Sequence, residues 1–223
     1  MKKLLSILLV ALIAAAPSLV EAKSAYSKQL QKQRKKEYKE KMNKLKKEGW
    51  QVFGSSHTLD VVLLEHYEKL MEEGIDELVG FATSTQKNIG SAKLLQDAAE
   101  KYASLQGQEL KGRTVTEHGS ELSEEDLIEL DSFLQGFGGK VQKEIAGELK
   151  PSYMIYRPSK TPSGKPCYEF EGYFIVDLES AHQARMKAMK NMMAEQKAMH
   201  QIADKTAKWI EEAFAEDNAK AEE

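Results

Sequence analysis

The side chains that could carry metal or acid–base chemistry are few. The chain of 223 residues has one cysteine, Cys167, and five histidines: His57, His66, His118, His182 and His200. None of the histidines stands at a recognised metal-ligand spacing from another histidine, a cysteine or a carboxylate. Since metal sites need several convergent ligands, we expect no metal and no cofactor. A lone cysteine cannot form a disulfide within the chain, and we expect Cys167 to be buried; the alternative is a disulfide with another chain.

Motifs for nucleophilic or phosphate chemistry are also missing. Ser55 and Ser120 do not lie in a Gly-x-Ser-x-Gly context, and the glycine-rich run 136–139 lacks the Lys-Ser/Thr of a phosphate loop. We therefore expect a protein that is not an enzyme. The alternative is a hydrolase-like or other enzyme whose site is built from dispersed residues around His57, His66 or Cys167.

Positive charge is concentrated near the start of the chain. Residues 23–48 hold eleven cations against three acids, although the net charge of the whole chain is −3. Basic residues near an anionic bilayer each contribute about 1 kcal/mol, so this segment could contact an anionic membrane surface. The alternatives are a helix that packs on its own acidic domain and a helix that binds a protein. The candidate contacts are Lys28, Lys32, Arg34, Lys35, Lys36 and Lys39.

A second candidate surface lies near the other end. From Glu179 to about Ala215 the chain has no Gly or Pro, which predicts one long helix. Part of it should project as a coiled-coil-like arm or pack on something else. Its methionines could form an adaptable surface for a partner. A row of methionines that packs in the protein's own core or pairs two helices is the more common arrangement. We expect an envelope protein or a second copy as the partner. The candidate contacts are Met189, Met192, Met193, Met199, Trp209 and Phe214.

Between these arms, hydrophobic periodicity predicts an α+β core over residues 49–180. We expect a small sheet of three to five strands with helices packed on one face, flanked by the basic N-terminal helix and the long C-terminal helix. The predicted strands are 50–53, 78–83, 111–117 and a hairpin of 153–157 with 168–178. The predicted helices are 58–73, 91–105, ended by Gly107, and one that Ser123 opens and that 136–139 interrupts or kinks.

This sequence pattern resembles the lipoprotein-20 type of exported bacterial proteins, which is related to the N-terminal domain of flagellar assembly protein T. The resemblance covers roughly residues 75–180: a helix with Ala92, Ala98, Ala99 and Ala103, then a Tyr153–Arg157 strand, then a closing strand from Tyr168 to Asp177. The chain also looks similar to uncharacterised exported proteins of Bacteroides-like bacteria. The resemblance implies an envelope-associated α+β module without enzyme activity.

The N-terminus predicts export. Lys2 and Lys3 precede an apolar stretch from Leu4 to Ala16, and Val20-Glu21-Ala22 has the small residues that a signal peptidase reads. We expect a signal peptide over 1–22, a basic arm over 23–48 and a C-terminal helix with an acidic tail over 181–223. No cysteine stands directly after the apolar stretch, so we expect a periplasmic protein that is not lipid-anchored. The near-neutral total charge argues against a nucleic-acid partner.

Overall fold

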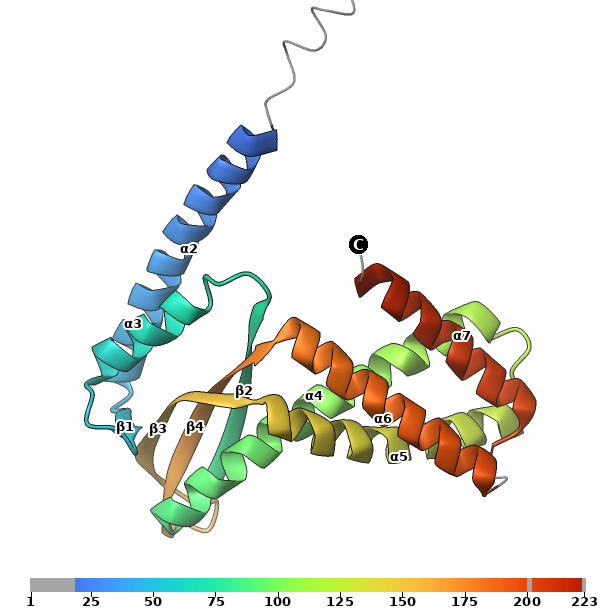
Figure 1. The fold of residues 1–223 in the computed structure, drawn as a ribbon. Coiled ribbons are helices and arrows are strands. Elements are labelled where there is room, and N and C mark those ends of the chain that lie inside the picture. Colours follow the sequence, from blue (N-terminus) through green and yellow to red (C-terminus); the bar gives the residue numbers. More distant parts are fainter. Residues whose placement is uncertain (1–18, 200–201, 222–223) are drawn as a thin grey trace, which may run out of the picture. The chain divides into compact units, whose positions relative to one another are not determined.

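The structure is a computed structural model that describes residues 19–199 and 202–221, with side chains described over 32–199 and 202–215. Most of the predicted signal segment, residues 1–18, lies outside the described residues. The chain divides into two compact units, residues 1–48 and 49–223. The described part of the first unit consists of α2 (Leu19–Lys47), one unbroken helix of 29 residues (Figure 1).

The second unit is built on a four-stranded antiparallel sheet. Its strands are β1 (Gln51–Phe53), β2 (Ile75–Ser84), β3 (Lys150–Lys160) and β4 (Pro166–Asp177), in the spatial order β1-β3-β4-β2. The predicted hairpin is present, because β3 pairs with β4 from Lys160↔Pro166 to Lys150↔Ile175. The register shifts between Pro151 and Tyr153, which leaves Ser152 unpaired as a β-bulge.

Five helices are described in this unit. They are α3 (Leu59–Lys69), α4 (Lys87–His118), α5 (Glu124–Glu148), α6 (Leu178–Ala198) and α7 (Asp204–Ala221). The α+β class is thus confirmed, and four strands fall within the three to five expected.

The strands have two different faces. The apolar face carries Phe170, Phe174 and Val176, which pack with Leu94 and Ala98 of α4. A Cβ at Gly80 of β2 would overlap the carbonyl oxygen of Leu94, so this glycine lets the helix lie directly on the strand. Because side chains alternate along a strand, the residues between these point to the opposite side.

That opposite side, here the polar face, carries Glu77 of β2, Tyr153 and Arg157 of β3, and Glu169, Glu171 and Tyr173 of β4. The sequence predicted helices on one face only. The structure differs, since the ring of His66 on α3 lies against Tyr153 and Tyr173 of the polar face, 5.1 and 5.9 Å between centroids.

Three predicted features between residues 105 and 139 are wrong. Gly107 does not end a helix and 111–117 is not a strand, because α4 continues to His118. Burial of Leu110 and Thr114 against α5 and α7 outweighs the roughly 1 kcal/mol that a helical glycine costs. The run 136–139 does not interrupt α5 either; a Cβ at Gly136 would overlap the methyl end of Met192, so this glycine admits α6.

The predicted single helix from Glu179 to about Ala215 is also wrong. It is two helices, since α6 ends at Ala198 and α7 begins at Asp204. The break allows α7 to fold back, and it buries Ile210, Ala213 and Phe214 in one cluster with α4, α5 and α6. Burial of this apolar stripe favours two packed helices over one projecting arm.

Candidate functional site

The basic residues of α2 form a row on one side of the helix. Lys32, Lys35, Lys36 and Lys39, here the lysine row, are all exposed, and their three-to-four spacing places them on one helical face. Arg34 lies outside the row, with its Nη1 3.5 Å from Glu37. Lys28 precedes the described side chains. The structure therefore brings together four of the six predicted cationic residues.

The residues predicted to contact a partner helix lie mostly inside the chain's own helical cluster. Met189, Met192 and Met193 of α6 are buried with Phe214 of α7, and Trp209 is buried as well. Met199, at 53% exposure, is the member of the predicted set that faces solvent. The stripe thus packs helices of one chain against each other.

The three residues of the enzyme alternative are not brought together. His57 is exposed and its Nδ1 lies 3.5 Å from Glu65. Cys167 is buried, as expected, at the start of β4. His66 lies against Tyr173 of the same strand, six residues further on, and at about 3.3 Å per residue this separates the thiol from the imidazole by roughly 20 Å.

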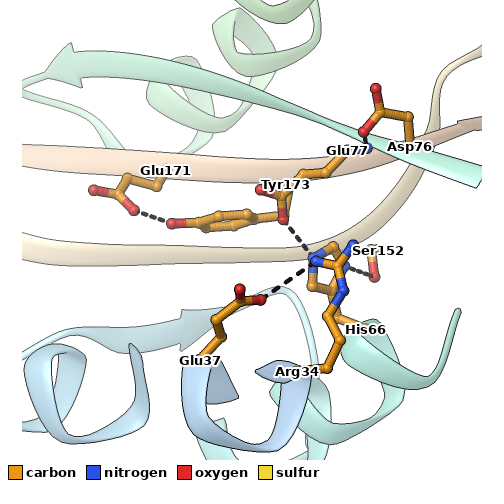
Figure 2. Close-up of polar contacts among 8 residues, drawn as sticks. All are labelled: Arg34, Glu37, His66, Asp76, Glu77, Ser152, Glu171 and Tyr173. Carbon is orange, nitrogen blue, oxygen red and sulfur yellow. Dashed lines mark hydrogen bonds and ion pairs between the residues drawn. The ribbon is translucent and has the colours of Figure 1, made fainter. Parts of the chain in front are cut away.

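His66 is instead the centre of a polar cluster that the sequence did not predict. The imidazole is 1% exposed, and each of its nitrogens has a partner. Nδ1 lies 3.0 Å from the hydroxyl of Ser152, and Nε2 lies 2.5 Å from a carboxylate oxygen of Glu77 (Figure 2). A serine, a histidine and a glutamate thus form a continuous chain of contacts.

Each member of this cluster is positioned by a separate element. His66 follows Val62 and Leu63 at helical spacing, so it lies on the face of α3 that is buried. Glu77 projects from β2 onto the polar face, and the Oδ1 of Asp76 accepts its backbone N–H at 2.8 Å. Ser152 occupies the β-bulge of β3, where the shifted register directs both Ser152 and Tyr153 toward His66.

Aromatic rings enclose the imidazole. Tyr153 and Tyr173 stack at 4.3 Å between centroids, and Tyr67 of α3 meets His66 edge-on at 5.7 Å. The Tyr173 hydroxyl donates a hydrogen bond to Glu171. Burial, foremost, raises the pKa of Tyr153 and of Tyr173 above the ordinary range of a phenol. Both rings therefore stay protonated at neutral pH and act as neutral walls.

A second polar group occupies the other end of the polar face. Ser159 donates a hydrogen bond to Glu169 at 2.7 Å, and the Nε of Arg157 donates to the other carboxylate oxygen at 2.7 Å. These two bonds, with Ser159 first, lower the pKa of Glu169. The Arg157 guanidinium also lies over the ring of Trp50, 4.7 Å from its centroid.

The remaining histidines do not enlarge either group. His118 stacks on Trp209 at 5.4 Å, and the Nδ1 of His182 lies 3.1 Å from Arg185, while His200 lies outside the described residues. Among the described residues, no group of three or more histidine, cysteine and acidic side chains could hold a metal ion. No described helix is long and apolar enough to cross a membrane.

Sequence reasoning missed Ser152, Glu77 and the two stacked tyrosines. The spacing of His66 on the apolar side of its helix was a signal that this histidine would be buried and would need partners. The partners come from strands 11 and 86 residues away in sequence, so spacing alone could not identify them.

Comparison with known proteins adds no relative. The chain matches no protein-family model, no curated protein and no solved structure. The class that the fold defines is α+β, and the likeness to the lipoprotein-20 type stays a prediction.

Proposed function

We propose that this is an exported binding or assembly protein of the cell envelope, which works through its basic helix rather than through catalysis. The observation that carries the proposal is the lysine row, four exposed cations on one face of α2. Its ligand would be an anionic surface such as a bilayer rich in acidic lipids. The predicted signal peptide is the support for export.

The charge balance along the helix supports an electrostatic mode of binding. Among the described residues of α2, the row has one ion pair with an acid of the same helix, Lys36 with Glu40 at 3.8 Å, and both of these side chains are about two-thirds exposed. Such an exposed pair contributes little, so it leaves the row able to turn to another anion. Each lysine near an acidic bilayer adds about 1 kcal/mol, which makes the four together a useful but salt-sensitive anchor.

The proposal is tested by co-sedimentation of the purified protein with vesicles. Vesicles of phosphatidylcholine alone are compared with an equal mixture of phosphatidylcholine and phosphatidylglycerol, at low and physiological salt. We expect binding to the mixture that weakens as salt rises. Replacing Lys32, Lys35, Lys36 and Lys39 together by glutamine should lower the affinity at least tenfold, because glutamine keeps the helix and removes the charge.

A matched control removes the same charge elsewhere. Lys93, Lys143, Lys165 and Lys190 are exposed lysines of the second unit, and their joint replacement by glutamine should change the affinity less than threefold. Equal losses in the two variants would show a general charge effect and contradict a role for the row. Binding that ignores salt or acidic lipid would contradict the electrostatic mode.

A further inference from the structure

The hydrogen-bonding roles around His66 follow from its acidic partner when Glu77 is ionised and the imidazole is neutral. An ionised carboxylate only accepts hydrogen bonds, so Glu77 requires the proton of the neutral imidazole to sit on Nε2. Nδ1 is then the acceptor, and the Ser152 hydroxyl, 3.0 Å away, is the donor. The proton of Ser152 is therefore directed at a base that Glu77 holds in place.

From this arrangement we propose that Ser152 is an activated nucleophile, a site at which the protein takes up an acyl or phosphonyl group from a reactive electrophile. His66 is the general base, and Glu77 is a positioning residue that sets the tautomer and the orientation of the ring. A nucleophile, a base within hydrogen-bond reach and a third group that orients the base are the parts that such chemistry requires.

The local backbone favours this role for Ser152. It is the bulged residue of β3, so neither its position nor its side chain is set by a ladder partner. The side chain is only half-buried, whereas the imidazole behind it is fully buried. The base is thus shielded from water, while part of Ser152 faces solvent.

The step is a single displacement. The Ser152 oxygen attacks the phosphorus of an alkyl fluorophosphonate, the new O–P bond forms and the P–F bond breaks. The Ser152 proton passes to Nδ1 of His66, and fluoride leaves with the electron pair of the broken bond. The product is a phosphonyl ester on Ser152 and an imidazolium that Glu77 stabilises.

The same strand offers an internal control. Ser159 lies seven residues further along β3 and is also half-buried, but its hydroxyl donates to the carboxylate of Glu169. In the structure its hydroxyl has a carboxylate partner where Ser152 has an imidazole. Activation by His66 therefore predicts that Ser152 reacts faster than Ser159 with the same reagent. Both are serines of the same strand and both are half-buried, so neither residue type nor burial accounts for such a difference.

The experiment treats the intact protein with an alkyl fluorophosphonate and locates the adduct by peptide mass spectrometry. We expect one adduct, on Ser152 and not on Ser159. S152A should abolish labelling and S159A should leave it unchanged. H66Q should lower the rate about 100-fold, since general bases contribute about 10²–10⁴. The rate on wild type should fall as the pH is lowered, because a protonated imidazole accepts no proton.

The role of Glu77 has its own readout. E77Q should slow labelling, and E77D, which keeps the charge, should restore part of the rate; a merely structural glutamate would not give this rescue. No adduct on Ser152, equal labelling of Ser152 and Ser159, or a wild-type rate independent of pH would each overturn the inference. The labelling experiment uses no vesicles, so its outcome is independent of whether the lysine row binds a membrane.

Discussion

The two faces of the central sheet show how one set of strands can serve two purposes. On the apolar face, Phe170 and Phe174 are fully buried against α4, with glycines where helix and strand approach most closely. On the polar face, the residues that alternate with the apolar ones along the same strands are Glu77 of β2 and Glu169, Glu171 and Tyr173 of β4. The period-2 alternation of strands produces this separation from a single sequence.

The two faces contribute differently to the stability of the fold and to its polar chemistry. Burying an aromatic ring contributes several kcal/mol, whereas a satisfied polar contact contributes about 1 kcal/mol net. Hence we expect each buried phenylalanine of the apolar face to contribute more to the free energy of unfolding than any single polar contact of the other face. The polar face holds groups whose value lies in their orientation, since His66 has a carboxylate on one nitrogen and a hydroxyl on the other.

Removing one aromatic ring from each face tests whether the two faces contribute differently to the free energy of unfolding. F170A should lower the free energy of unfolding by about 3–5 kcal/mol, because the ring is 1% exposed and its removal leaves a cavity in the core. F81A removes a ring that is 50% exposed on the other face and should cost less than about 1.5 kcal/mol. Urea denaturation followed by circular dichroism measures both. Similar losses would contradict a dominant apolar face.

Alkaline pH should weaken the polar face selectively. Because burial raises the pKa of Tyr153 and Tyr173, the unfolded chain releases these protons at a lower pH than the folded chain. Their stabilising effect is complete below about pH 10 and is lost as the pH rises further, by up to about 1.4 kcal/mol per pH unit for each tyrosine.

The test measures the free energy of unfolding between pH 8 and pH 11 for wild type and Y153F. Removing one phenol should make the alkaline slope clearly shallower, whatever its effect at pH 8. An identical slope in the two proteins would show that Tyr153 ionises as easily in the folded as in the unfolded chain, contrary to its burial.

Local sequence signals predicted the elements in which one pattern dominates. The alternating residues of β4 and the basic run of α2 each predicted the correct type of structure, and Ser123 does cap α5 through a hydrogen bond with Asp126. The errors occur where packing outweighs a local signal. Gly107 suggested a helix end, but α4 continues, and α6 and α7 are two separate helices although the predicted run from Glu179 to about Ala215 contains no Gly or Pro.

The polar cluster was beyond sequence reasoning for a different reason. His66 was a candidate, but its partners depend on the order β1-β3-β4-β2, which brings β2 and β3 to either side of β4. They also depend on the bulge at Ser152. Without this extra residue, the regular alternation of β3 would place the Ser152 side chain on the face of the sheet opposite to that of Tyr153. Neither strand order nor a bulge position can be read from a two-residue period.

The smallest expected effect concerns the second polar group. Since the Ser159 hydroxyl is the largest cause of the lowered pKa of Glu169, S159A should move that pKa back toward its ordinary value. A lowered carboxyl pKa stabilises the fold above the unfolded pKa, and this is lost as pH falls through the folded pKa. S159A should therefore cost about 0.5 kcal/mol near pH 7, a small value because Glu169 is about one-third exposed.

Urea denaturation of wild type and S159A at pH 7 and pH 3 measures this effect. The difference between the two proteins should shrink as the pH falls from 7 to 3, because protonation of Glu169 removes the charge that the Ser159 hydroxyl stabilises. A deficit that persists unchanged at pH 3 would mean that Ser159 stabilises β3 by packing. In that case the polar face would resemble the apolar face, and the comparison between them would hold only for the group around His66.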